Sequence, residues 1–311
     1  MAARVVYLGN AAWSVPPLAA LADHPDLEVV LVLTRTPRPG RRGAGPEPTP
    51  VATAARERDL PVAEVASVRE GEGRERLLAA RPDVLAVVAY GELLPREVLD
   101  AAELGAVNLH LSLLPRWRGA SPVQHALLAG DAETGVTAML IDEGLDTGPI
   151  LEQVPTPVGD DEDAGALGAR LAELGGPLFA RAVAAVADGT AVPVPQDGAD
   201  ATSAPKLTGE DRRIRWDEPA GSVLGRIRAF APSPGADTLR NGRRLKILAA
   251  TMAPVTSAEP GTVIAVGRDG FDVAAGGGSV RVLEVASEGR ARMDAASWVR
   301  GAHLEPGERL G

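Results

Sequence analysis

The feature that most constrains the fold is an alternation of short apolar runs with Ala- and Leu-rich segments along residues 1–189. The run Val84–Ala89 is apolar throughout, which is typical of a strand that helices cover on both faces. Similar runs at Arg4–Leu8 and Leu27–Leu33 are each followed by a segment with helical character. The sequence therefore predicts a doubly wound α/β domain with a mostly parallel sheet, which binds ligands at the carboxyl ends of its strands.

The character of the chain changes after residues 190–205, which are rich in Pro, Gly and Asp and have no sustained period. Short β-rich runs separated by turns follow, at Arg244–Leu248, Thr262–Ala265, Phe271–Ala274 and Val280–Val285. Such runs favour a small β-barrel similar to an oligonucleotide-binding (OB) fold. We predict a catalytic domain at 1–189, a linker at 190–205 and an OB-like domain at 206–311.

Composition excludes several kinds of site. The 311 residues include no cysteine, which excludes disulfides, thiolate metal sites and cysteine nucleophiles. With four scattered histidines, no metal is expected. Gly9 is not followed by G-x-G-x-x-G, and the chain has no P-loop motif. The N-terminus has no secretory signal and no apolar run reaches about 18 residues, so a cytoplasmic monomer without membrane contact is expected.

The charge is unevenly distributed. Residues 206–311 hold 16 basic and 13 acidic residues, a balance of +3, whereas the rest of the chain carries −13 of the total charge of −10. A basic accessory domain on an acidic body suits contact with a phosphate backbone, although chance asymmetry explains a balance of +3 equally well.

Polar side chains of catalytic character are concentrated between Ala106 and Ile150. Asn108 and His110 lie two residues apart on a predicted strand, Val107–Leu111, so they point to the same face. A second predicted strand, Gly135–Ile141, leads to a Gly-flanked loop that carries Asp146. An amide, an imidazole and a carboxylate that meet at strand ends can stabilise an oxyanion and transfer a proton.

Spacing alone does not establish that site. The Asn108 amide could bond strand-end backbone groups, His110 could be structural, and Asp146 could be a turn residue. Ser112 lacks the G-x-S-x-G context of a serine nucleophile, so the three residues suit direct attack by an amine on an acyl carbon.

A long motif around these residues resembles a known family, and this resemblance favours the catalytic interpretation over the structural one. The segment Asn108–Gln124 (NLHLSLLPRWRGASPVQ), continued by Gly144-Leu145-Asp146-Thr147-Gly148, resembles the signature of the methionyl-tRNA formyltransferases, which are folate-dependent formyltransferases. Val87–Pro95 is similar to the folate-proximal strand of that family, and Pro205-Lys206-Leu207 to the entry of its C-terminal domain. The resemblance covers nearly the whole chain and implies a Rossmann-like catalytic domain of the formyltransferase type.

The resemblance also implies the reaction and its residues. The formyl group of 10-formyltetrahydrofolate would pass to the amino group of initiator methionyl-tRNA, with Asn108, His110 and Asp146 as the catalytic trio. The implied folate-binding set is Tyr90, Leu93, Leu94, Ser112, Leu113, Leu114, Pro115, Val136, Ile141 and Asp142. The implied tRNA-binding set is Arg38, Arg41, Arg42 and Lys206. No metal is required.

Some positions depart from the family pattern and leave other acceptors open. Gly9-Asn10-Ala11 stands where the family has Gly-Thr-Pro, and Arg215 precedes Trp216 where an Asp is common. The alternatives are a related formyltransferase acting on a sugar nucleotide, a glycinamide-ribonucleotide-like amine or a small-molecule amine, and a hydrolase in which water replaces the amine. A tRNA- or folate-binding module without catalysis is the alternative from another class.

Overall fold

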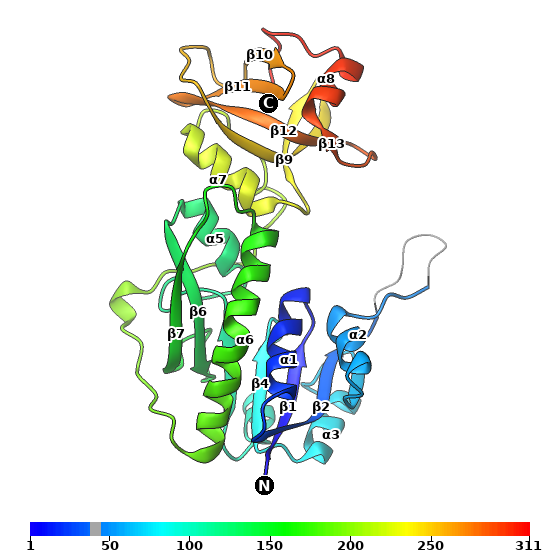
Figure 1. Ribbon diagram of the computed structural model, residues 1–311, viewed down its shortest axis with the longest axis vertical. Coiled ribbons are helices and arrows are strands. Elements are labelled where there is room, and N and C mark those ends of the chain that lie inside the picture. The colour runs from blue at the N-terminus through cyan, green and yellow to red at the C-terminus, as the bar shows by residue number, and fades with distance from the viewer. Residues whose placement is uncertain (38–44) are drawn as a thin grey trace. The chain divides into compact units, whose positions relative to one another are not determined.

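The computed structural model describes residues 1–37 and 45–311. These residues form two compact units (Figure 1). Unit 1 comprises Met1–Pro122, Thr134–Thr156 and Gly168–Pro205. Unit 2 comprises Val123–Glu133, Pro157–Leu167 and Lys206–Gly311. The residues expected to form a linker therefore belong to the compact body of unit 1.

Unit 1 is built on a seven-stranded sheet with the order β3-β2-β1-β4-β5-β6-β7. The strands are β1 (Ala3–Gly9), β2 (Leu27–Arg35), β3 (Val62–Val65), β4 (Val84–Val88), β5 (Ala106–His110), β6 (Glu133–Leu140) and β7 (Ile150–Pro157). The first five strands pair in parallel, and β6 runs antiparallel to β5. The predicted doubly wound, mostly parallel sheet is confirmed, and its order reverses between β1 and β4, where such sheets bind ligands.

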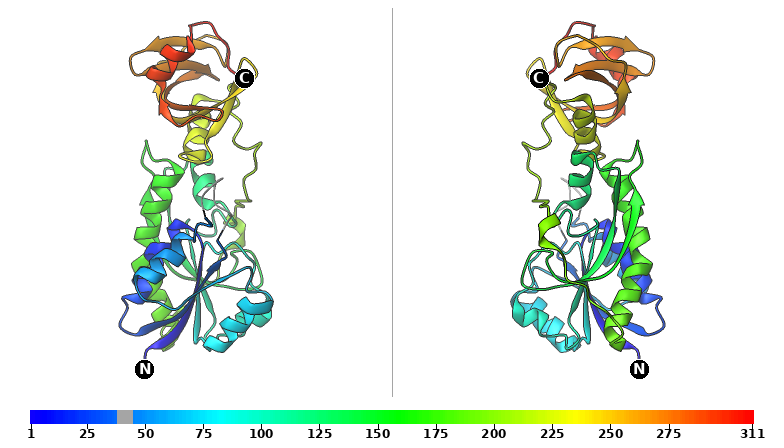
Figure 2. Two further views of the ribbon diagram at one scale, coloured as in Figure 1. Left: turned by 90° about the vertical axis from the view of Figure 1, so that its right-hand side faces the viewer. Right: turned by 90° about the vertical axis from the view of Figure 1, so that its left-hand side faces the viewer.

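Helices cover both faces of this sheet (Figure 2). The helices of unit 1 are α1 (Val15–Ala22), α2 (Pro50–Glu57), α3 (Gly71–Ala80), α4 (Arg96–Leu99) and most of α6 (Ala164–Asp188). Close contacts place α6 against the turn that follows β1 and against β5. A Cβ at Gly168 would meet the Trp13 ring at 2.2 Å, and a Cβ at Gly175 would meet Leu109 Cδ2 at 2.8 Å. On the other face, α3 and α4 cover a buried core that includes Leu8, Leu85 and Val87.

Unit 2 contains an antiparallel sheet with the order β10-β11-β12-β9-β8, and β13 pairs with β12. The strands are β8 (Ala236–Arg240), β9 (Arg243–Ala253), β10 (Val263–Gly267), β11 (Gly270–Ala275), β12 (Gly278–Ser287) and β13 (Met293–Asp294). The helices are α5 (Pro122–Ala129), α7 (Ala220–Phe230) and α8 (Ala295–Ala302). The four predicted strands are present, and the sequence analysis did not predict α7 or α8.

The amide of Asn10 ties three chain segments together at the carboxyl end of β1. Its Oδ1 accepts hydrogen bonds from the backbone N–H of Arg35, at 2.8 Å, and from Thr34 Oγ1, at 3.1 Å. Its Nδ2 donates to the carbonyl of Tyr90 in the loop after β4. The residue that departs from the family pattern thus joins the ends of β1, β2 and β4, where the sheet order reverses.

Replacing Asn10 with alanine is expected to destabilise unit 1 by about 2 kcal/mol, because part-buried partners at Arg35 and Tyr90 lose their hydrogen bonds. The urea midpoint of the unit 1 transition measures this loss. Thr53→Ala on α2 is the control, since the exposed Thr53 hydroxyl bonds within its own helix. Equal midpoints for the Asn10 and Thr53 variants would contradict the assigned role of Asn10.

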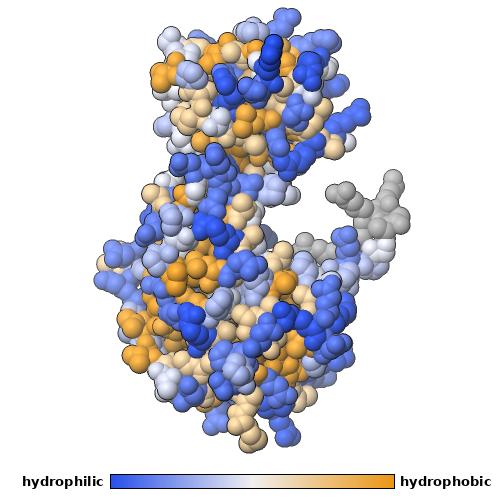
Figure 3. Space-filling view, viewed as in Figure 1, coloured by the Kyte–Doolittle hydropathy of each residue, from blue (hydrophilic) through white to orange (hydrophobic). Residues whose placement is uncertain are grey.

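The surface of each unit mixes hydrophilic and apolar side chains on the face shown in Figure 3. Within the described part of the chain, no helix combines the length and the apolar character that crossing a bilayer demands.

Candidate active site

Strand β5 directs its two polar side chains away from α6. A Cβ at Gly175 of α6 would meet Leu109 Cδ2 at 2.8 Å, so Leu109 packs against that helix. Because successive side chains of a strand alternate between faces, Asn108 and His110 point to the opposite face. That face also carries Ala106, which belongs to the core covered by α3 and α4. The two predicted catalytic residues of β5 therefore lie on the same face of the sheet as this core, towards the carboxyl end of the strand.

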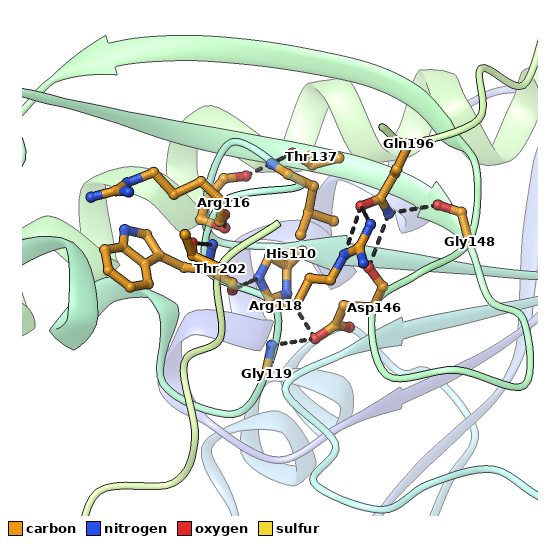
Figure 4. Close-up of polar contacts among 12 residues, drawn as sticks. His110, Arg116, Arg118, Gly119, Thr137, Asp146, Gly148, Gln196 and Thr202 are labelled. Carbon is orange, nitrogen blue, oxygen red and sulfur yellow. Dashed lines mark hydrogen bonds and ion pairs between the residues drawn. The ribbon is translucent and has the colours of Figure 1, made fainter. Parts of the chain in front are cut away.

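His110 is buried, with 5% of its surface exposed, and both ring nitrogens face polar groups (Figure 4). Nε2 lies 2.8 Å from the backbone carbonyl of Trp117. Because a carbonyl only accepts, Nε2 carries a hydrogen and donates it. Nδ1 lies 3.6 Å from Asp146 Oδ2, so it is the nitrogen that faces the carboxylate. The contact with Trp117 fixes the orientation of the ring and leaves Nδ1 for chemistry.

Asp146 reaches His110 from a loop and not from the end of a neighbouring strand. Because β6 is antiparallel to β5, Leu140 lies opposite Val107, at the start of β5. The connection from β6 to β7 then brings Asp146 back to the imidazole, and Asp146 Oδ2 also accepts the backbone N–H of Gly119 at 2.8 Å. Asp146 has a φ of +54°, in the left-handed region that few residues other than glycine adopt. The carboxylate is therefore held by a backbone bond and by an unusual loop conformation.

Asn108 is half-buried on the same face, paired in register with Val87 of β4 and Met139 of β6. Among the hydrogen bonds of the described residues, none involves its side-chain amide, unlike the amides of Asn10, Gln153 and Gln196. The amide is thus available to a ligand beside the imidazole.

The loop after β5 is fixed by its own polar groups. Ser112 Oγ donates to the carbonyl of Arg116 at 2.7 Å, and Thr137 Oγ1 donates to the carbonyl of Ser112 at 2.6 Å. Gln153 Nε2 donates to the carbonyl of Leu114 at 2.9 Å. The Ser112 hydroxyl thus stabilises the loop, which agrees with the expectation that the reaction uses no serine nucleophile.

Unit 1 contains a cavity of about 640 Å³. It is lined by residues of α4 and of the segment that leads to β5, between Arg96 and Ala106, and by residues 141–144, which follow β6. Ala106 precedes Asn108 by two residues on the same face of β5, and Gly144 precedes Asp146 by two residues in its loop. The lining therefore comes within two residues of Asn108 and of Asp146 in the chain, although no member of the trio belongs to it, and the cavity is large enough for a small organic co-substrate.

The structure brings only part of the expected folate-binding set to this cavity. Ile141 and Asp142 line it, and Leu94 and Ile141 each pack against the core that α3 and α4 cover. Leu93 is 65% exposed, whereas Val136 is completely buried in β6. Five members lie elsewhere in unit 1: Tyr90 in the core, and Ser112, Leu113, Leu114 and Pro115 in the loop after β5.

Tyr90 presents a buried hydroxyl without a hydrogen-bond partner among the described residues. Burial raises the pKa of this phenol, and the nearby carboxylate of Glu92 raises it further. The hydroxyl is therefore a neutral donor at physiological pH, and its lack of a partner carries an energetic cost.

Of the expected tRNA-binding residues, Lys206 is exposed at the start of the long segment of unit 2. Arg38, Arg41 and Arg42 lie outside the described residues.

Several residues that shape the site were missed by the sequence analysis. Gln196 and Thr202, in the segment interpreted as a linker, bond the loops around His110 and Asp146. Arg118 bonds Gln196 in turn. The only sequence signal, a composition rich in Pro, Gly and Asp, favours a solvated linker and so concealed these contacts.

Comparisons with known proteins cover both units. The formyl transferase family model matches residues 3–183, and the formyl transferase C-terminal domain model matches residues 206–303. The chain is 42% identical to the methionyl-tRNA formyltransferase of Magnetococcus marinus, covering 99% of this chain and 98% of that protein. It is 44% identical to the methionyl-tRNA formyltransferase of Thermus thermophilus, covering 99% of each chain.

Solved structures support the fold. Aquifex aeolicus HypX in complex with tetrahydrofolic acid matches with a TM-score of 0.66 at 17% identity, over 96% of this chain and 47% of that one. The chain thus spans about half the length of HypX. The sugar 3N-formyl transferase WlaRD matches with a TM-score of 0.66 at 16% identity, over 94% of this chain and 99% of that one.

Proposed function

The chain belongs to the formyl transferase family, and we propose that it transfers the formyl group of 10-formyltetrahydrofolate to the amino group of initiator methionyl-tRNA. The observation that carries the proposal is the similarity to methionyl-tRNA formyltransferases along the full length of both units. The chemistry is supported by the pairing of His110 with Asp146, beside an Asn108 amide that no described residue bonds.

In the proposed reaction, the neutral amine of the methionyl group attacks the formyl carbon. An α-amino group titrates near pH 8, so a useful neutral fraction exists without a strong base. The carbonyl oxygen becomes an oxyanion that the Asn108 amide and the Nδ1–H of His110 stabilise. Collapse of the tetrahedral intermediate breaks the bond to N10 of the folate, which takes up a proton and leaves as tetrahydrofolate.

Asp146 supports this step through its position beside Nδ1 of His110. Its carboxylate faces the imidazole ring and offers an acceptor for the proton that the amine loses. Because Nε2 of His110 is bonded to the Trp117 carbonyl, the proton and the oxyanion are both handled on the Nδ1 side of the ring.

The cavity beside the trio is the proposed site for the pteridine of the folate. Ile141 supplies an apolar wall, and Asp142 supplies a carboxylate that can accept from the ring N–H groups. A pteridine bound in this cavity would direct the formyl group of the folate towards Asn108 and Asp146. These residues follow the lining residues Ala106 and Gly144 in the chain.

The acceptor is tested by offering the enzyme 10-formyltetrahydrofolate with a panel of amines. The panel contains charged initiator tRNA, free methionine amide and an amino-sugar nucleotide, and transfer is followed as N-formyl product. We expect a kcat/KM for methionyl-tRNA at least about 1000-fold above that for the small amines. Transfer to the small amines alone would remove methionyl-tRNA from the proposal and leave the formyl chemistry intact.

The arginines at 38, 41 and 42 are proposed to bind the tRNA backbone. Replacing all three with alanine is expected to weaken tRNA binding and to reduce the slope of log Kd against log salt by about 2 to 3, one for each phosphate that is no longer neutralised. Filter binding at several salt concentrations measures the slope. Arg58→Ala is the control, since Arg58 pairs with Asp23 on unit 1. An unchanged slope in the triple variant would assign those arginines to solvent.

A further inference from the structure

Residues 196–204, which we call the strap, lie along the two loops that carry the active-site groups. Thr202 accepts the backbone N–H of Trp117 on Oγ1, at 3.0 Å, and its carbonyl accepts the N–H of Arg118, at 2.8 Å. Ala204 donates to the carbonyl of Arg118 at 2.7 Å. At its other end, Gln196 bonds the loop of Asp146. Figure 4 shows the Gln196 side chain between Arg118 and Gly148.

Both the nitrogen and the oxygen of the Gln196 side-chain amide form hydrogen bonds, and these bonds fit only one orientation of the amide. Its Nε2 donates to the carbonyls of Asp146, at 2.9 Å, and Gly148, at 2.7 Å. Its Oε1 accepts from Nε and Nη2 of Arg118, at 3.0 and 2.8 Å. Because carbonyls only accept and a guanidinium only donates, the opposite orientation of the amide would break all four hydrogen bonds. The side chain is therefore locked in place.

These bonds reach the two residues of these loops that have a positive φ and are not glycine. Trp117 and Asp146 have φ values of +68° and +54°, which are unfavourable for residues other than glycine. Such conformations persist only where the surroundings fix them. The strap bonds the N–H of Trp117 through Thr202 and the carbonyl of Asp146 through Gln196. The carbonyl of Trp117 in turn orients His110.

We propose that Gln196 and Thr202 are positioning residues for the formyl transfer, Gln196 acting through Asp146 and Thr202 acting through Trp117 on His110. This inference rests on the proposed function. Within the strap, the positioning role belongs to these two side chains alone, and neither of them contacts the reacting atoms. Loss of either bond lets its loop relax, and the carboxylate or the imidazole then moves out of alignment.

Variants of the two residues separate this role from a general structural one. Gln196→Glu keeps an oxygen for Arg118 but places oxygen against two carbonyls, so kcat is expected to fall about 10-fold, as in Gln196→Ala. Thr202→Val removes the acceptor for the Trp117 N–H and is expected to lower kcat by a similar factor, whereas Thr202→Ser keeps the acceptor and restores the rate. KM for both substrates should change little. The thermal midpoint is expected to fall modestly, because hydrogen bonds between loops are lost, so kcat is measured well below it.

The control lies in the same strap. Asp197→Ala removes a side chain that is exposed and bonds the N–H of Ala199 within the strap, so kcat should stay at the wild-type value. An equal loss in the Asp197 variant would show that any disturbance of the strap reduces activity, and would overturn specific roles for Gln196 and Thr202. A wild-type kcat in Gln196→Glu would overturn the inference directly.

A double-mutant cycle with Asp146→Asn distinguishes failure of this inference from failure of the proposed function. If Gln196 acts through Asp146, adding Gln196→Ala to Asp146→Asn should cost less than about 2-fold, although it costs about 10-fold alone. Multiplicative losses would overturn the inference while Asp146 keeps its role. Normal activity in Asp146→Asn itself would instead refute the proposed site.

Discussion

Replacing His110 with alanine is expected to lower kcat by at least about 100-fold, because the oxyanion loses a donor and the Asp146 carboxylate loses the ring that it faces. Binding of the folate is expected to be largely kept, since His110 is not among the residues that line the cavity. Steady-state kinetics with methionyl-tRNA and a folate-binding titration measure the two quantities on the same protein.

His24→Ala is the matched control for this substitution. His24 is likewise bonded to the backbone of unit 1, where its Nδ1 accepts the N–H of Asp26, but it lies in the turn between α1 and β2. Its removal should leave kcat within about 2-fold of the wild type. A His110 variant with near-normal turnover would remove the imidazole from the mechanism.

Replacing Asn108 with alanine is expected to cost about 3 kcal/mol of transition-state stabilisation, or roughly 100-fold in kcat. The amide has no hydrogen-bond partner among the described residues, so its removal breaks no bond of the fold. The thermal midpoint should therefore stay at the wild-type value while turnover falls.

The opposite pattern would give Asn108 a different role. A lower thermal midpoint with normal turnover would mean that the amide stabilises the strand end, which is the alternative that spacing alone left open. Gln153→Ala provides the reference for that outcome, because the Gln153 amide bonds the Leu114 carbonyl and Thr137 Oγ1 and should stabilise the fold.

The apolar runs of the sequence predicted the layers of the catalytic fold because strands that are buried on both faces consist of apolar residues. Val84–Ala89 contains the completely buried β4, Val84–Val88, and Val107–Leu111 overlaps β5. Strand β3 is only four residues long, and β7 is partly exposed along its length, so neither produces a strong apolar signal. These strands were found only in the structure.

The convergence of the site depends on facts that local patterns do not contain. The sequence places Asn108 and His110 on one face, because alternation along a strand is local. It does not reveal that β6 runs antiparallel to β5, nor that Asp146 therefore returns through a loop in a left-handed conformation. The bonds of Gln196 span 48 to 78 residues of sequence, and the composition around it resembles that of a solvated linker.

The central claim is that one site moves a formyl group from the folate to the amine of methionyl-tRNA. It is tested most directly by a single-turnover reaction in which the formyl carbon of 10-formyltetrahydrofolate is isotopically labelled. The account predicts label in the N-formyl group of methionine still esterified to tRNA, at a rate that collapses in the His110 variant. Label released as formate, with the methionyl amine unmodified, would contradict it.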